Sequence, residues 1–214
     1  MYKINVKTLS LSDYDGLKQY ESQYMQSLSK NNRSFREQHK HRNWEYMGAV
    51  EYLNSIVLSP KNILDVGGCG SPFPYYIKDM TGANVTVIDP DTNSFNDFGI
   101  KYIQKLPSGK DFAGYDFISC ISVLEHIPDD KAFIKDLVTN MDTNAVVYIT
   151  CDWFKTGARL VNEHLRTYNI DNVYNLFDAV ADDCETEIEI DFDINEENNV
   201  NGYNFARITI ERIY

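Results

Sequence analysis

The chain has 214 residues, 43% of them hydrophobic and 24% charged, which is the composition of an average globular domain. Its 20 lysines and arginines are outnumbered by 32 aspartates and glutamates, and this net charge of −12 disfavours a long nucleic acid as the substrate. No run of about 18 or more apolar residues occurs, which excludes a conventional membrane-spanning helix.

The first part of the chain predicts two helices. Large side chains recur there at helical spacing in two sets: Leu17, Tyr20, Tyr24 and Leu28, and then Tyr46, Val50, Leu53 and Val57. Ser59-Pro60 ends the second helix. We therefore expect residues 1–58 to form an N-terminal helical lid and residues 60–214 to form the core of a single domain.

From residue 62 onward, short runs rich in β-branched residues alternate with helical segments. The predicted strands are Asn62–Val66, Asn84–Asp89, Lys101–Ile103, Tyr115–Cys120 and Ala145–Thr150. Pro128–Met141 is one of the predicted helices, with its large apolar side chains on one face. This alternation indicates right-handed βαβ units, and therefore an α/β fold with a mostly parallel sheet covered by helices on both faces.

The end of the chain departs from this alternation. Asn169–Asp183 predicts a helix, whereas Glu187–Ile194 alternates strictly between acidic and apolar residues. A polar turn separates that strand from a last one, Asn204–Ile213. Because two strands joined without a helix form a hairpin, we expect a C-terminal antiparallel hairpin in which one strand opposes the rest of the sheet.

A glycine-rich turn follows the first predicted strand, in the segment Ile63–Pro74. Asp65 lies inside the strand, and Gly67, Gly68, Cys69 and Gly70 form the turn. Glycines let the backbone approach a ligand closely, and the following helix offers free N–H groups at its N-terminus. An acid two residues before the first glycine suits a ligand that carries a cationic amine.

Two further segments place chemistry at the ends of predicted strands. Asp89 closes the second strand, where a carboxylate can accept both hydroxyls of a ribose. Tyr115–Cys120 opens into a loop that carries the pair Glu125-His126. The carboxyl ends of parallel strands lie at one edge of a sheet, so these segments predict a shared cleft.

Taken together, the three segments resemble the class I S-adenosylmethionine-dependent methyltransferases. Ile63–Gly70 is similar to the first motif of that family, Val87–Asp89 to the second, and Tyr115–Ile127 to the fourth. The resemblance covers roughly residues 40–214. It implies a Rossmann-like, doubly wound, mostly parallel seven-stranded sheet, S-adenosylmethionine as cofactor, and methyl transfer to a small molecule.

The resemblance also implies roles for individual residues. Asp65 and the backbone of Gly67–Gly70 would hold the methionine end of the cofactor, and Asp89 the ribose. Residues that would flank the adenine or line the sulfonium side are Pro90, Asp91, Cys120, Ile121 and Ser122. The chain departs from the family at Cys69, where glycine is usual, and at Gln104-Lys105-Leu106, where an acid often lies near the adenine amine.

Three residues are candidates for a general base. His126 lies in the loop after the fourth strand, and its unperturbed pKa suits proton removal near neutral pH. Asp152 and His164 follow the fifth strand, where the substrate would approach. A structural role in capping or packing the adjoining helix is the alternative for His126.

Three more residues are candidates for substrate contacts. Trp44 and Tyr46 lie in a segment similar to a lid element of some relatives, and Arg166 precedes a predicted helix. Arg166 would either hold a substrate carboxylate through two hydrogen bonds or pair with a neighbouring acid. The basic segment from Lys30 to Arg42 is either a solvated helix face or part of a lid that attracts an acidic substrate.

Cysteine usage and the N-terminus bear on compartment and metal content. The four cysteines, at positions 69, 120, 151 and 184, include no C-x-x-C pair, and the first residues lack the pattern of a signal peptide. We expect a cytoplasmic protein with reduced thiols and without a bound metal.

Other functions stay open at this point. The chain could use the same cofactor for another group transfer or a lyase reaction, or bind it without catalysis. A nicotinamide-dependent oxidoreductase would need the pattern Gly-x-Gly-x-x-Gly, but this chain has Phe73 at the position of the last glycine. Methylation of DNA bases is disfavoured, because Ser119–Ser122 stands where an Asn-Pro-Pro-Tyr signature would lie. We expect a small-molecule substrate and no membrane partner, and the sequence leaves the oligomeric state open.

Overall fold

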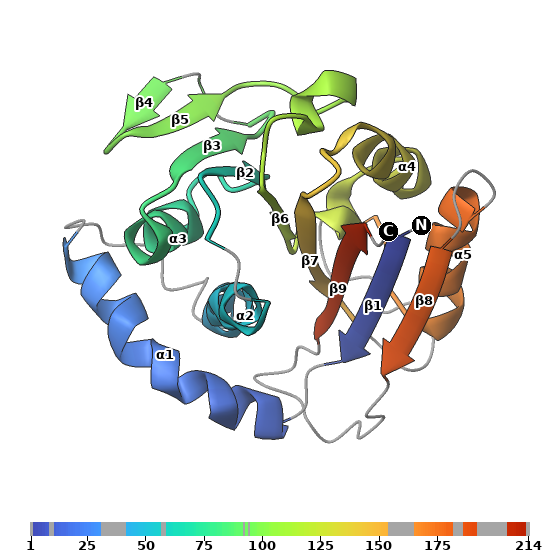
Figure 1. Ribbon diagram of the computed structural model, residues 1–214, viewed down its shortest axis with the longest axis horizontal. Helices are drawn as coiled ribbons and strands as arrows, with labels where there is room; N and C mark the ends of the chain where they lie inside the picture. Colours follow the sequence, from blue (N-terminus) through green and yellow to red (C-terminus); the bar gives the residue numbers. More distant parts are fainter. Residues whose placement is uncertain are drawn as a thin grey trace.

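The computed structural model describes residues 2–8, 11–30, 42–56, 59–91, 93, 95–153, 165–181, 186–191 and 205–212. These residues form one nine-stranded sheet with helices on both faces (Figure 1). In order across the sheet, the strands are β4 (Phe95–Asp97), β5 (Ile100–Ile103), β3 (Asn84–Ile88), β2 (Asn62–Val66), β6 (Phe117–Ile121), β7 (Val146–Asp152), β9 (Phe205–Arg212), β1 (Tyr2–Thr8) and β8 (Thr186–Asp191). Only β4 and β9 run against the other described strands.

Two hydrophobic cores lie on the two faces of this sheet. One lies under α1 (Leu11–Lys30), α2 (Asn43–Ser55) and α3 (Phe73–Thr81), and the other under α4 (Asp130–Asn140) and α5 (Ile170–Ala181). The helices separate into the same two groups in Figure 1. Short 3-10 helices, η2 (Gly109–Phe112) and η3 (Leu124–His126), join elements on the second side. The predicted doubly wound, mostly parallel α/β fold is confirmed.

The central strands are buried on both faces, as parallel strands in such folds are. All of Ile63–Val66 is buried in β2, as is every residue of β6. Asp65 is therefore an acid inside an otherwise apolar strand, with only 2% of its surface exposed. A buried carboxyl of this kind requires a partner or a function.

The sheet has two strands more than predicted, and β1 changes its arrangement. Residues 2–8, which the sequence assigned to the helical lid, form a strand between β9 and β8. Ile4 lies opposite Ile210 on one side and opposite Ile188 on the other. The two predicted C-terminal strands do run antiparallel to each other, but β1 separates them: it pairs in parallel with β8 and antiparallel with β9, and its Tyr2, Ile4 and Val6 are buried.

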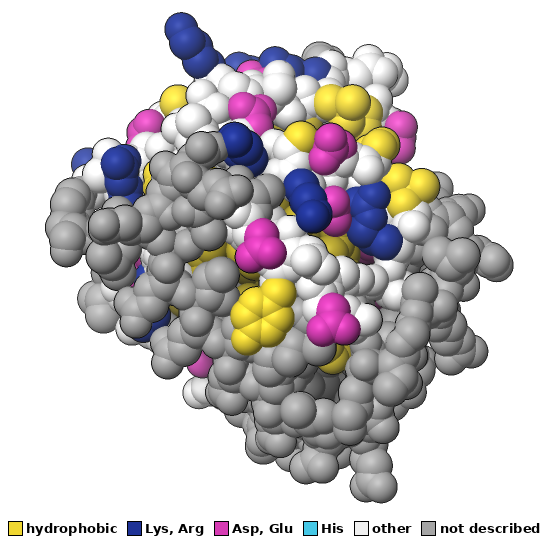
Figure 2. All heavy atoms as spheres, turned by 90° about the vertical axis from the view of Figure 1, so that its right-hand side faces the viewer, with side chains coloured by type: hydrophobic (Ala, Val, Ile, Leu, Met, Phe, Trp, Pro, Cys, Tyr) yellow, Lys and Arg dark blue, Asp and Glu magenta, His cyan; other side chains and the backbone are white. Residues whose placement is uncertain are grey.

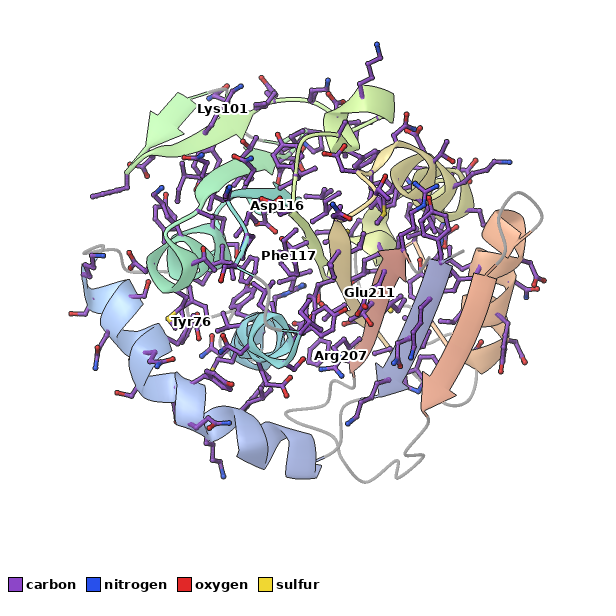
Figure 3. All side chains as sticks on the ribbon, viewed as in Figure 1. Tyr76, Lys101, Asp116, Phe117, Arg207 and Glu211 are labelled. Carbon is purple, nitrogen blue, oxygen red and sulfur yellow. The ribbon has the colours of Figure 1, made fainter. Side chains whose placement is uncertain are left out.

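Helix α2 packs against the sheet along most of its length. A Cβ atom on Gly48 would lie 2.7 Å from the Tyr148 hydroxyl, so the helix approaches β7 closely only because glycine stands there. At its C-terminal half, Tyr52 donates to Glu211, and Arg207 lies 3.3 Å from the Glu51 carboxylate. Figure 3 shows Arg207 and Glu211 on β9 beside this helix. A lid role for the N-terminal helices remains a prediction.

The described surface mixes charges of both signs. On the side of the molecule that lies at the right of Figure 1, acidic and basic side chains alternate with scattered hydrophobic ones (Figure 2). The excess of acidic residues is thus not gathered into one patch on the part of this face that the structure describes. No helix within the described ranges is long and apolar enough to cross a membrane.

Candidate functional site

A cavity of about 370 Å³ lies at the carboxyl ends of β2, β3 and β6. Its lining residues are Arg42, Tyr46, Asp65, Val66, Gly67, Gly68, Cys69, Ser71, Phe73, Asp89, Pro90, Asp91, Ile121, Ser122, Val123 and His126. From β2 the chain adds β3 and β5 on one side of that strand, and it then crosses back to add β6 on the other side of β2. Ligands of open α/β sheets bind at such a switch point, so this is the place where a cofactor site is expected.

The first two residues of the turn after β2 have no room for a side chain. Gly67 has a φ of +75°, and its N–H donates to the Ile88 carbonyl at 2.8 Å. A Cβ atom there would lie 2.4 Å from Val123, and one on Gly68 would lie 1.8 Å from the Asp65 carboxylate. Both positions therefore require glycine, and the bare backbone lines the cavity.

Asp65 reaches the cavity from inside β2. The Ser119 hydroxyl donates to Oδ1 at 2.7 Å, while Oδ2 has no hydrogen-bond partner among the described residues. Burial raises the pKa of Asp65 to about 7; the Ser119 hydrogen bond opposes this rise and the charge of Asp89 adds to it. The unpaired oxygen points to a ligand that brings its own donor, because an unsatisfied buried acceptor is costly.

Asp89 ties the end of β3 to the glycine turn. One carboxylate oxygen accepts the Cys69 N–H at 3.0 Å, and the other accepts the Asp91 N–H at 2.8 Å. These two bonds fix the plane of the carboxylate at the cavity wall. Each oxygen still has a second lone pair to offer a ligand.

Another part of the cavity wall is built around Ser122, the residue that directly follows β6. Its φ of +48° lies in the left-handed region that a serine rarely adopts. The Ser122 hydroxyl donates to Glu45 Oε1 at 2.6 Å, and its N–H donates to the Thr150 carbonyl at 3.0 Å. Arg42 donates to the Ser122 carbonyl at 3.2 Å, and the Thr150 hydroxyl donates to the same Glu45 oxygen.

Three acids are buried behind this wall: Glu45, Glu125 and Asp152. Burial raises the pKa of Glu45 to about 7, although Arg42 and the hydrogen bonds from Ser122 and Thr150 oppose the rise. Burial also raises the pKa of Glu125 to about 8, and the charge of Asp152 adds to this. The pKa of Asp152 is raised by burial and held back by Arg42 and His126. The described residues include no group arranged to hold a metal ion.

Most residues that the sequence assigned to the cofactor do line this cavity. They are Asp65, Gly67, Gly68, Cys69, Asp89, Pro90, Asp91, Ile121 and Ser122. Gly70 is exposed and outside the lining, and its φ of +72° gives it a conformational role in the turn. Cys120 is also outside, because side chains alternate along β6 and its thiol packs into the core under α4 and α5.

The three candidate bases fall in different places. His126 is exposed and lines the cavity. Asp152 ends β7 with 2% of its surface exposed, and it is not among the lining residues. His164 lies outside the described residues.

Of the predicted substrate contacts, Tyr46 lines the cavity. Its ring is buried, and its hydroxyl accepts a hydrogen bond from Ser71 at 3.1 Å. Trp44, two residues earlier on α2, is half-buried and does not line the cavity. Only one of these two aromatic side chains is therefore placed to meet a ligand in it.

Arg166 has structural partners away from the cavity. Its guanidinium donates to the carbonyls of Ile127 and Pro128 at 2.6 and 2.8 Å, and it lies 3.1 Å from the Asp130 carboxylate. The alternative of pairing with a neighbouring acid thus describes this arginine. These bonds hold the loop after η3 against the start of α4. The guanidinium therefore already has structural partners in place of a substrate carboxylate.

Of the basic segment at 30–42, only the two ends are described. Lys30 pairs with Asp79 at 2.6 Å on the exposed end of α1. Arg42 lines the cavity, and sequence reasoning did not single it out as a site residue. Glu45 was missed in the same way, because its bonds to Ser122 and Thr150 join residues 77 and 105 positions apart, which no local pattern reveals.

Residues 38–180 match a family model described as a methyltransferase domain. No curated protein sequence matches the chain. Among solved structures, the plantazolicin methyltransferase BpumL with S-adenosylhomocysteine and a substrate analogue is 12% identical, covers 94% of this chain and 100% of its own, and has a TM-score of 0.57. The Burkholderia thailandensis 1,6-didemethyltoxoflavin-N1-methyltransferase is 13% identical, with coverage of 94% and 90% and a TM-score of 0.53. Coclaurine N-methyltransferase is 10% identical, with coverage of 83% and 73% and a TM-score of 0.52. Because these sequence identities are low, the similarity to these structures shows a shared fold alone.

Proposed function

The chain belongs to the methyltransferase domain family, and from this premise we propose that it binds S-adenosylmethionine in the cavity and transfers its methyl group to a small molecule. When bound, the cofactor supplies a methyl group on a positively charged sulfur, so the activated group is its own. One observation carries the proposal: a turn that begins with two obligatory glycines, Gly67 and Gly68, is tied through the Cys69 N–H to the strand-end acid Asp89 at the switch point of the sheet.

The glycine turn and Asp65 fit the methionine end of this cofactor. Gly67 and Gly68 present backbone alone, and any side chain on Gly68 would collide with Asp65. The unpaired Oδ2 of Asp65 supplies an acceptor for an ammonium group. A bound cation would also lower the pKa of this carboxyl, which burial alone raises.

Asp89 and its neighbours fit the nucleoside end. The two backbone N–H groups that bind the Asp89 carboxylate leave one lone pair on each oxygen, which suits the two hydroxyls of a ribose. Pro90 and Asp91 follow directly along the cavity wall and would flank the adenine. The role of this chain in the reaction is then to orient the cofactor and to exclude water from it.

The acceptor would enter beside Arg42, Tyr46 and His126, the lining residues opposite the nucleoside end. A small molecule is favoured because two methyltransferases that share the fold are named for such acceptors, 1,6-didemethyltoxoflavin and coclaurine. His126 lines the cavity on this side, and its imidazole would accept a proton from the acceptor atom. Burial raises the pKa of Asp152 and the charge of His126 opposes that rise, so Asp152 would stabilise the resulting imidazolium.

Calorimetric titration tests this proposal. The purified protein is titrated with S-adenosylmethionine, S-adenosylhomocysteine and NAD, and so are the variants Asp89→Ala and Asp171→Ala. The control residue Asp171 is an exposed acid in the first turn of α5, far along the chain from the cavity. We expect micromolar binding of the first two ligands, its loss in Asp89→Ala, and its retention in Asp171→Ala. Binding of NAD alone, or of none of the three, would refute the proposal.

A further inference from the structure

The wall of the cavity at Ser122 depends on a backbone conformation that serine does not favour. Its φ of +48° places it in the left-handed region, and it is 97% buried at the end of β6. Within the described part of the chain, Phe98 is the one other non-glycine residue with a positive φ, and it lies in an exposed turn. A strained residue inside a ligand cavity persists only when its surroundings hold it there.

Hydrogen bonds join Ser122 and Thr150 to each other and to one carboxylate oxygen of Glu45. The Ser122 hydroxyl donates to Glu45 Oε1 at 2.6 Å. The Ser122 N–H is shared between the Thr150 carbonyl at 3.0 Å and the Thr150 hydroxyl at 3.2 Å, and that hydroxyl donates to the same Glu45 oxygen. Glu45 thus binds both the side chain of Ser122 and one of the two groups that receive its backbone N–H.

Glu45 itself is fixed from the other side. It lies in the first turn of α2, where the helix N-terminus favours a negative charge. The Tyr148 hydroxyl donates to its carbonyl at 3.1 Å, and the nearby Arg42 bridges to the Ser122 carbonyl. The side chain is fully buried, so it holds Ser122 from a rigid position rather than from a mobile surface chain.

From this arrangement we infer that Glu45 is a positioning residue: it holds Ser122 in the left-handed conformation and thereby shapes the cavity wall that meets the reacting end of the cofactor. The effect on the cofactor rests on the function proposed above, whereas the effect on Ser122 does not. A direct contact of Glu45 with the acceptor is the competing account, since its second oxygen has no hydrogen-bond partner among the described residues.

Glycine at position 122 separates the two accounts, because it adopts a φ of +48° without being held. The experiment measures Glu45→Ala in the wild-type background and in the Ser122→Gly background. The first readout is the urea midpoint of unfolding, which needs no ligand. We expect Glu45→Ala to lower the midpoint, and the shift to be at least halved in the Ser122→Gly background. Equal shifts in both backgrounds would overturn the inference that Glu45 holds Ser122.

The second readout is the calorimetric affinity for S-adenosylhomocysteine. We expect Glu45→Ala to weaken it about tenfold in the wild-type background and less than about threefold with glycine at 122. Glu45→Gln keeps an acceptor oxygen for both hydroxyls, so it should retain affinity within about threefold. Equal loss in both backgrounds, or no rescue by glutamine, would overturn the link to the cavity wall.

A matched control lies on the same helix. Glu51 is also a glutamate of α2, but it pairs with Arg207 on a half-exposed surface. Glu51→Ala should change neither readout in a way that depends on residue 122. If the wild-type protein binds no S-adenosylhomocysteine, the proposed function fails, and the urea comparison still decides whether Glu45 holds Ser122.

Discussion

The burial of Asp65 lowers the stability of the free protein but provides an acceptor for a ligand. It lies inside β2, an inner strand of the sheet, with one oxygen bonded to Ser119 and the other without a hydrogen-bond partner among the described residues. Burying a charge there costs free energy of folding, and burial raises the pKa of this carboxyl to about 7 for that reason. Such local conflicts are typical of functional positions.

The substitution Asp65→Asn separates these two effects. Asparagine keeps an acceptor for the Ser119 hydroxyl but places an NH₂ group where a ligand ammonium would bind. Since a hydrogen bond to a charged group contributes about 1.5–3 kcal/mol, we expect S-adenosylmethionine affinity to fall about 10- to 100-fold. The melting temperature of the free protein at pH 8 should stay the same or rise. A lower melting temperature with unchanged affinity would contradict this account.

Residue-scale prediction from sequence succeeded where the signal is local. Asp65, Gly67, Gly68 and Asp89 stand at or beside strand ends that the apolar pattern locates, and they do meet at the cavity, whereas Gly70 does not. Arg42 and Glu45 escaped, because their function depends on which distant backbone their side chains reach. The left-handed conformation of Ser122 escaped for another reason: serine in a sequence predicts no positive φ.

At the scale of elements, α2 owes its position to the closeness of Gly48 to β7. The Tyr148 hydroxyl occupies the space that a Cβ atom would need, at 2.7 Å, and the next nearest atoms lie 3.9 Å away. Glycine in the middle of a helix is otherwise unfavourable, by about 0.5–1 kcal/mol relative to alanine. Packing therefore decides this position against helix propensity.

This predicts a change of sign in a double-mutant cycle. Gly48→Ala alone should lower the free energy of unfolding, because the new methyl group collides with the Tyr148 hydroxyl. In a Tyr148→Phe background the colliding atom is absent, and the same substitution should raise the free energy of unfolding by about 0.5–1 kcal/mol. Urea denaturation of the four proteins checks this. Destabilisation of similar size in both backgrounds would show that the contact is not the cause.

Element-scale prediction succeeded for the parallel strands between residues 62 and 152 and failed at β1. Those strands are short runs rich in β-branched residues between turn residues, and their predicted ranges overlap those of β2, β3, β5, β6 and β7. Apolar and polar residues alternate regularly at Tyr2–Thr8, but a segment of seven residues is too short for this pattern alone to identify a strand. Its insertion between β8 and β9 is a matter of long-range pairing, which periodicity does not encode.

At the scale of the whole molecule, three buried acids with raised pKa values make stability depend on pH. Burial raises the pKa to about 7 for Glu45 and Asp65 and to about 8 for Glu125. In the unfolded chain these groups lose their protons near pH 4, so between pH 4 and 8 the folded state holds more protons. Stability therefore falls as the pH rises through this window.

We expect the melting temperature of the free protein to decrease from pH 5 to pH 8. One group crossing one pH unit contributes about 1.4 kcal/mol, which corresponds to about 2–4 °C in a domain of this size. Glu125→Gln should make the decrease shallower, because it removes the group with the highest of the three pKa values. Differential scanning fluorimetry across the range checks both statements. A melting temperature that rises toward pH 8 would rule out the uptake of protons on folding.

The place of β1 in the sheet also constrains the order in which the protein can be made. The strands from β2 to β7 lie within residues 62–152 and pair with one another, so that six of the nine described strands can assemble before the later ones have been made. β1 is synthesised before all of them, yet both of its neighbours, β8 and β9, come after residue 185. Its apolar Tyr2, Ile4 and Val6 must wait until residues 186–212 have been made, although β1 precedes all of their partners in the chain (Figure 1). Such long-range closure is slow and leaves a strand edge exposed, so the nascent chain depends on protection of this segment until β8 and β9 are available.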